Sequence, residues 1–340
     1  MLVSKVNNFS ITKNKPCTFK STSAGAPLRG LKNITDPYFG EKMITASDFE
    51  KTAKILLTKN TVKQAISVLN KFRTNMQVVE KNIFDAFRFA APHMPKVQFN
   101  DLLKMWYDKA LVSLKIEELR VLNEIDDLSV ELEPETTFKV MKKTTHCREV
   151  IFKDDPADRF KRKTVIDSID EINPQNDGEE KALSILKKRA NYLPTSNTSI
   201  NAFIVKYASR RHDEIAERLI RASTQSIEHV HPDSLGGENS LDNFILASSA
   251  ANSLRGNMPL TDFIEMFPQV PSNTQKYIDD IIDVINSGGL KKHQSYPYQI
   301  APTLKRESEG LINLDLSRMK YTEEEAKLME SRFFRQKKRK

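Results

Sequence analysis

Cysteine and long apolar runs are scarce in this sequence. Its 340 residues contain only two cysteines, Cys17 and Cys147, so a disulfide framework and a four-cysteine zinc site are both unexpected. No run of 18 apolar residues occurs, and no transmembrane helix is predicted. The N-terminus lacks the sustained apolar stretch of a secretory signal peptide. We therefore expect a cytoplasmic protein, with delivery by a route that needs no such signal left open.

Positive charge is in excess and unevenly placed. The formal net charge is +8, and the last nine residues, RFFRQKKRK, carry six positive charges and no negative one. The segment from Glu117 to Glu135 is strongly acidic instead. A localised basic region suits a polyanionic partner such as nucleic acid, or a solvated tail. Charge alone therefore supports a nucleic-acid function without establishing one.

The periodicity of apolar residues predicts a mainly α protein of the α+β class. Short β-prone pieces between Glu131 and Phe152 and around residue 228 interrupt the helical pattern. Helices are expected at about 47–69, 76–91, 98–127, 179–191, 198–222 and 272–286, and from about 322 to the end.

Composition suggests four regions along the chain. A loosely ordered leader with a turn element is expected at 1–45, and a mostly helical domain of unknown role at 46–195. The region 196–290 contains the residues suited to chemistry, and 291–340 forms an extension with a basic helical tail.

The segment from Ser226 to Leu260 is the most informative part of the chain. Ser226 to Val230 has the character of a short strand, and Phe244 to Leu246 of a second. A Gly-Gly loop lies between them. Ser248 to Leu254 can then form a short helix that ends before Gly256. The predicted order is strand, loop, strand and helix.

This pattern resembles the ββα-metal fold of HNH endonucleases, also called the His-Me finger superfamily. In that family an acidic residue or histidine precedes a general-base histidine, with a proline three residues later. A Gly-rich loop, a structural asparagine and a helix carrying a ligand Asn or His follow. The matching positions in this chain are Glu228, His229, Pro232, Gly236–Gly237, Asn243 and Asn252. The match covers about 35 to 60 residues.

The resemblance assigns roles to these residues. His229 would be the general base, because histidine can accept a proton from water near neutral pH. Glu228 and Asn252 would hold one divalent cation, Mg²⁺ or Mn²⁺, that stabilises the phosphate and the leaving oxygen. Asn243 would bind loop backbone and orient His229. Glu228 departs from the Asp or His that is usual at its position, and its longer side chain would have to reach the same metal from a slightly displaced backbone.

Basic residues near this segment are candidate nucleic-acid contacts. Arg255 is expected to bind DNA phosphate, where relatives often have Lys or Arg. Solvated helix faces explain the other arginines and lysines almost as well. His231 and Asn257 are possible additional site residues, and a surface role is favoured for His231. The remaining candidates for nucleic-acid binding are Arg218, Arg221, Lys337, Lys338 and Arg339.

Two further motifs have ordinary explanations. The turn DPYFG, which begins at Asp36, resembles half of the zinc knuckle that many HNH proteins carry, C-P-Y-C-G. Asp36 and Phe39 replace its cysteines, and phenylalanine cannot bind zinc, so no zinc knuckle is expected. His212, on a predicted helix, is expected to be exposed, and neither His146 nor Cys147 lies in a recognisable motif.

Two functions compete on the sequence alone. The first is a metal-dependent endonuclease that hydrolyses DNA, acting as an antibacterial toxin effector or as an antiviral defence nuclease. It would be of bacterial or phage origin, with an immunity protein or a separate ATPase chain as partner, since no GxxxxGK[ST] loop is present. The second is a non-catalytic nucleic-acid-binding or assembly protein with a decayed HNH fold. Double-stranded DNA is the expected partner, and a membrane is not.

Overall fold

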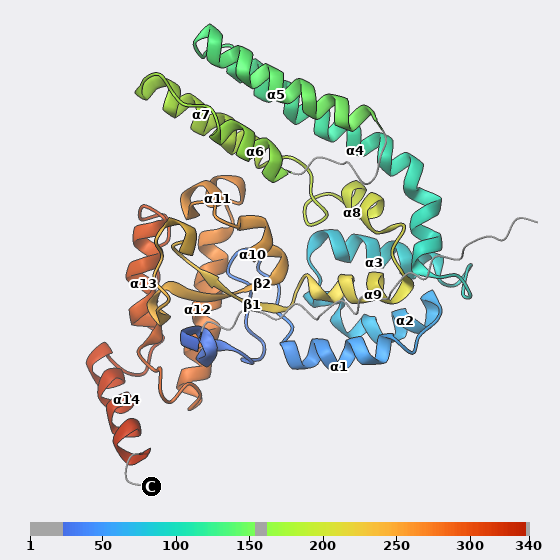
Figure 1. Ribbon diagram of the computed structural model, residues 1–340. Helices are drawn as coiled ribbons and strands as arrows, with labels where there is room; N and C mark the ends of the chain where they lie inside the picture. Colours follow the sequence, from blue (N-terminus) through green and yellow to red (C-terminus); the bar gives the residue numbers. More distant parts are fainter. Residues whose placement is uncertain (1–22, 154–161, 338–340) are drawn as a thin grey trace, which may run out of the picture.

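A computed structural model describes residues 23–153 and 162–337 (Figure 1). Within these residues the protein is mainly helical, with a single two-stranded antiparallel sheet. The predicted mainly α class with a small β component is therefore confirmed. None of the described helices is long and apolar enough to cross a membrane. Cys147 is free and buried, whereas Cys17 lies outside the described residues.

Three separate apolar cores hold the described chain together. The first, the helical core, joins helices from two distant parts of the sequence. Its side chains include Phe84, Phe99 and Phe203, all fully buried. The helices that contribute are α1 (Ala46–Leu56), α2 (Val62–Leu69), α3 (Val78–Ala90), the first half of α4 (Phe99–Ser129), α8 (Ile200–Tyr207) and α9 (His212–Arg221).

The second core lies in an arm that extends from the helical core (Figure 1). The second half of α4 packs there against α5 (Pro134–Phe152) and α7 (Asp177–Ala190), and α6 (Arg162–Asp170) contacts α5 and α7. The prediction of short strands in 131–152 is wrong, because this segment is helical. Its buried residues fall on one helical stripe that packs on α4, so tertiary packing outweighs the β preference of its Thr and Val residues. The stripe consists of Thr136, Val140, Thr144, Cys147 and Ile151.

The third core, the ββα core, surrounds the sheet. Its central unit consists of β1 (Gln225–His229), β2 (Phe244–Ser248) and α10 (Ser249–Arg255). The helices α11 (Leu260–Met266), α12 (Val270–Asn286) and α13 (Tyr296–Glu307) cover it. The last helix, α14 (Glu323–Lys337), is joined through the carboxylate of Glu330, which accepts hydrogen bonds from Ser295.

The cores divide the chain differently from the regions expected from composition. Leu28, Ile34 and Tyr38, from the expected leader, are fully buried in the ββα core. Residues 296–312, from the expected extension, belong to the same core. The helix predicted at 198–222 is two helices, α8 and α9, and both belong to the helical core. Burial against neighbours far apart in sequence decided these memberships, which local composition does not encode.

The turn at Asp36 holds the N-terminal segment against the sheet. One oxygen of its buried carboxylate accepts the backbone N–H groups of Tyr38 and Phe39, and the other accepts the N–H of Ser248 at the end of β2. Phe39 packs edge-on against Phe267, with ring centres 5.5 Å apart. Hydrogen bonds and aromatic packing therefore hold this turn.

Candidate functional site

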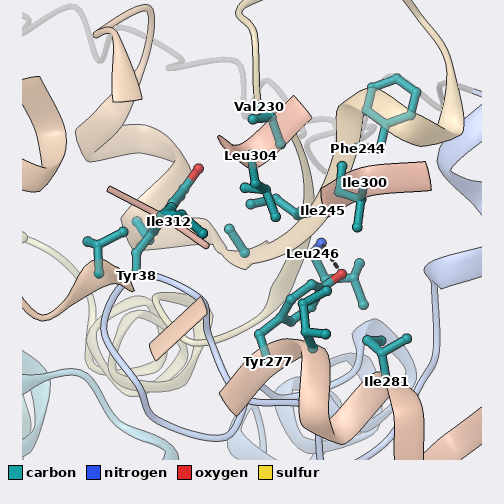
Figure 2. Packing of buried hydrophobic residues seen from close by; sticks show 14 of the residues in the cluster. Tyr38, Val230, Phe244, Ile245, Leu246, Tyr277, Ile281, Ile300, Leu304 and Ile312 are labelled. Carbon is teal, nitrogen blue, oxygen red and sulfur yellow. Dashed lines mark hydrogen bonds between the residues drawn. The ribbon is translucent and has the colours of Figure 1, made fainter. Parts of the chain in front are cut away.

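The sheet supplies a rigid platform for the candidate residues. His229 pairs with Phe244 and Glu228 with Ile245 in the antiparallel register of β1 and β2. All five residues of β2 are buried, so its outer backbone edge needs partners that are not water. Two buried tyrosines supply them. The hydroxyl of Tyr277 accepts the N–H of Leu246, as Figure 2 shows, and Tyr296 donates to the carbonyl of Phe244.

Asn243 closes the loop between the two strands. Its side-chain oxygen accepts the N–H of His231 at 2.8 Å, and its amide nitrogen donates to the carbonyls of His231 and Glu238. Gly237 allows the tight return, because a Cβ atom there would lie 1.9 Å from the carbonyl oxygen of His231. Asn243 binds loop backbone, as the sequence suggested, and its influence on His229 is exerted through the loop.

His229 lies at the end of β1 and lines a cleft of about 510 Å³. Its ring packs edge-on against Phe244, and its Nε2 atom is 3.1 Å from the side-chain oxygen of Asn239. An amide oxygen accepts hydrogen bonds, so this contact assigns the proton to Nε2. Nδ1 is then the basic nitrogen, and no described group bonds to it. The cleft is lined by Arg29, Gly30, Ala46, Gln225, Ser226, Ile227, His229, Asp233, Asn239 and Leu246.

Glu228 and Arg255 form an ion pair inside the ββα core. The Oε1 atom of Glu228 lies 2.5 Å from Nη1 of Arg255, and the two side chains are 5% and 0% exposed. Burial raises the pKa of Glu228 to about 7, although Arg255 opposes the shift. The guanidinium also donates to the carbonyls of His229 and Val230, both at 2.6 Å. Arg255 therefore ties α10 to the end of β1.

This arrangement differs from the roles that the resemblance gave to both residues. Arg255 was expected to bind DNA phosphate, yet it is buried and bonded to Glu228 and to two backbone carbonyls. From its sequence position at the end of α10, the side chain of Arg255 could point either into solvent or into the core. Only the packing of the helix on the sheet turns this side chain inward.

Asn252 also faces the strand rather than the cleft that contains His229. Its amide nitrogen donates to the hydroxyl of Ser226 and to the carbonyl of Ile227, both at 2.9 Å. Its side chain thus fastens α10 to β1. Neither Asn252 nor Glu228 lines the cleft among the described residues.

The residues present do not fit the expected cation site. Glu228 would have to release Arg255 before its carboxylate could bind a metal, which would leave a buried guanidinium without its counter-charge. Within the described ranges, no group of three or more His, Cys, Asp or Glu side chains is arranged to hold a metal ion. In this arrangement the carboxylate of Glu228 is paired with Arg255 and is not free to bind a cation.

His231 follows β1 and is held from two sides. Its Nδ1 atom lies 2.7 Å from the carboxylate of Glu307 on α13, and its Nε2 atom 3.0 Å from the carbonyl oxygen of Leu235. Hydrogen bonding to Glu307, and then to Leu235, raises the pKa of His231. Because both partners are acceptors, the charged imidazolium satisfies them best. His231 is half-buried and joins the loop to α13, in place of the free surface position that was favoured.

The other basic candidates are dispersed. The guanidinium of Arg218 is buried against Glu80, at 2.6 Å, and also bonds Tyr207 and Asn197. Arg221 is half-buried, pairs with Glu217 and lies over the ring of Phe49.

The remaining candidates lie away from the buried pairs or beyond the described chain. Asn257 is exposed in the turn after α10. Lys337 ends α14, and Lys338 and Arg339 fall outside the described residues. His212, expected to be exposed, is buried and accepts the N–H of Phe99 through Nδ1. The burial of His212 follows from the contact between α9 and the start of α4, which sequence periodicity did not reveal.

The cleft residues that were not identified from the sequence include Arg29, Asp233 and Asn239. Asn239 and Asp233 belong to the loop between the strands, and Arg29 to the N-terminal segment. The two loop residues could have been identified from the sequence, because they are polar and lie close to His229 in the chain. Arg29 is 200 positions away from His229 and carries no local signal.

Comparisons with known proteins add no relatives. No family model matches the chain, and neither the curated proteins nor the solved structures contain a match. Functional inference therefore depends on the residues and their geometry.

Proposed function

We propose that this protein is an endonuclease that hydrolyses phosphodiester bonds of DNA with His229 as the general base. The observation that carries the proposal is the environment of His229. It lies in an open cleft at the end of a strand, with Nε2 bonded to Asn239 and Nδ1 available to accept a proton. The strand, loop, strand and helix order of the HNH pattern surrounds it. Comparable His–amide contacts select the tautomer of catalytic histidines.

The chemistry requires one proton transfer at His229. A water molecule in the cleft would lose a proton to Nδ1 and attack the phosphorus atom. The bond from phosphorus to the 3′ oxygen would then break, and the leaving oxygen would take a proton from solvent water. Asn239 would hold the imidazole ring in place while it gains charge. Asn243 would act on the ring only through the loop that carries Asn239.

Dependence on one divalent cation, Mg²⁺ or Mn²⁺, remains part of the proposal. Such an ion would neutralise charge that develops on the phosphate. Because the carboxylate of Glu228 is paired with Arg255, we assign no catalytic step to the ion. Other oxygen atoms would have to bind it.

The ion pair between Glu228 and Arg255 favours a second function. Glu228 bonded to Arg255 suits a nucleic-acid-binding or assembly protein that kept the ββα scaffold and lost its metal. Such a protein would bind DNA without cutting it. An immunity protein, or an ATPase in a separate chain, remains a proposed partner of the nuclease.

Substitution of His229 separates the two functions. The full-length protein is incubated with supercoiled plasmid and Mg²⁺ or Mn²⁺, with and without EDTA, and nicked and linear products are quantified. His229→Ala is expected to lower the cleavage rate at least about 10²-fold, the usual scale for loss of a general base. EDTA is expected to abolish cleavage by the wild type.

The matched control is His146→Ala, which removes an exposed histidine on α5, far from the cleft in sequence. It should cut at the wild-type rate. Cleavage by His229→Ala at the wild-type rate would refute the mechanism. A wild type that binds DNA and cuts none with either metal would favour the binding protein.

A further inference from the structure

The cleft at His229 has a second wall that comes from the N-terminal segment. Arg29, Gly30 and Ala46 line the cleft together with residues of β1. Ala46 is the first residue of α1, and Arg29 follows the short 3-10 helix η1 (Ser23–Leu28). The walls are thus brought together by tertiary packing between segments 200 positions apart.

Three contacts fix the segment that carries Arg29. Gly25 lies against β1 so closely that an added Cβ atom would be 2.9 Å from the side chain of Ile227. Leu28 is fully buried in the ββα core. The side-chain amide of Gln225 donates to the carbonyl of Leu31. The backbone of Arg29 is therefore anchored on both sides, while its side chain is exposed.

Among the described residues that line the cleft, Arg29 is the only lysine or arginine and Asp233 is the only acidic one. No described carboxylate forms an ion pair with Arg29, in contrast to Arg218 and Arg255. Its guanidinium is always charged and can donate two parallel hydrogen bonds to the non-bridging oxygens of a phosphate.

We infer that Arg29 binds a phosphate of the nucleic-acid strand that occupies the His229 cleft. The inference rests on the proposed function and deepens it, because it names the residue that positions the substrate backbone. Arg29 takes the role that the sequence had suggested for Arg255. A strand in the cleft would contact both Arg29 and His229, because both residues line it.

Two variants and a control test the inference by cleavage. Plasmid cleavage is measured for Arg29→Ala, Arg29→Lys and Arg120→Ala. Arg120 lies on α4 in the arm, and its side chain is 73% exposed. Its substitution by alanine removes one positive charge, as Arg29→Ala does, but away from the cleft. Arg29→Ala should lower kcat/KM about 10- to 100-fold, the range for a lost hydrogen bond to a charged group. Arg29→Lys should recover part of the loss, and Arg120→Ala should match the wild type.

A binding measurement keeps the test independent of cleavage. The affinity for a DNA duplex is measured at several salt concentrations in the His229→Ala background, with and without Arg29→Ala. Loss of one phosphate contact should make the slope of log K against log salt less negative by about 0.9. Equal thermal unfolding midpoints of the two proteins show that the fold is retained.

The outcomes separate this inference from the proposed function. If His229→Ala is inactive while Arg29→Ala cuts and binds like the wild type, the inference is wrong and the nuclease stands. If His229→Ala cuts like the wild type, the nuclease mechanism is wrong. In that case the salt dependence of DNA binding still tests the role of Arg29. A slope of log K against log salt that Arg29→Ala leaves unchanged overturns this role, and a less negative slope supports it.

Discussion

The helical core and the ββα core each contain one buried arginine paired with a glutamate. In the helical core, Arg218 contacts Glu80 at 2.6 Å. In the ββα core, Arg255 contacts Glu228 at 2.5 Å. Both arginines were candidate DNA contacts because of their charge and position. The sequence does not distinguish a buried arginine from an exposed one, because the glutamate partner is 138 positions away from Arg218 and 27 positions away from Arg255.

The two pairs differ in what they connect. Arg218 joins α9 to α3 and to the residues before α8, and its guanidinium lies over the rings of Phe203 and Tyr207. Arg255 also binds the carbonyl of His229, the candidate base. The first pair should therefore affect stability alone, whereas the second should affect stability and the position of His229. The following substitutions test this difference.

The largest effect is expected from breaking the pair in the ββα core. Arg255→Ala leaves Glu228 buried without its partner and removes two bonds to backbone carbonyls, so it should lower the free energy of unfolding by about 3–5 kcal/mol. Urea unfolding followed by circular dichroism measures the loss. The double variant Glu228→Leu/Arg255→Met should be less destabilised than Arg255→Ala.

Cleavage by the fraction of Arg255→Ala that remains folded should also fall, because the end of β1 loses its anchor. A stability close to that of the wild type would show that the pair contributes little. Normal cleavage per folded molecule would show that Arg255 does not position His229.

A slightly smaller loss is expected in the helical core. Arg218→Ala should lower the free energy of unfolding by about 3 kcal/mol, because Glu80 stays buried while other contacts of α9 persist. Cleavage per folded molecule should equal that of the wild type, measured below the onset of unfolding. A specific loss of cleavage would remove the distinction between the two arginines.

The smallest effect concerns the pH dependence of the contact between His231 and Glu307. Hydrogen bonding raises the pKa of His231 above its usual 6.5, so the folded state retains a proton that the unfolded chain releases. The resulting stabilisation is complete below about pH 6.5 and is lost as the pH rises through the folded-state pKa. His231→Gln should remove this part of the pH dependence.

Thermal unfolding midpoints between about pH 6 and about pH 9 measure the effect, with the gap between wild type and His231→Gln narrowing as pH rises. Glu307→Gln should change the profile in the same way, because it removes the partner of the same proton. A gap that is constant across this range would show that His231 does not carry the effect.

Local sequence patterns predicted the central unit well and the wider arrangement poorly. The strand, loop, strand and helix order agrees with β1, β2 and α10 within one or two residues at most boundaries. Segment 131–152 was mistaken for strand because Thr and Val favour strands, and its burial on α4 decided otherwise. The helix predicted at 198–222 is divided at residues 208–211, where Ala208 is buried in the helical core and the next three residues are exposed.

For the candidate site, the sequence by itself determined which residues stand at the ends of the strands and in the loop. His229 and Asn243 are there because their spacing to the strands is local, and the Gly-Gly loop and helix follow from local preferences. Tertiary structure alone decided which side chains face the cleft. Glu228 and Arg255 turned inward because a buried charge needs a partner, and Arg29 reached the cleft because Gly25, Leu28 and Leu31 anchor its segment on the ββα core.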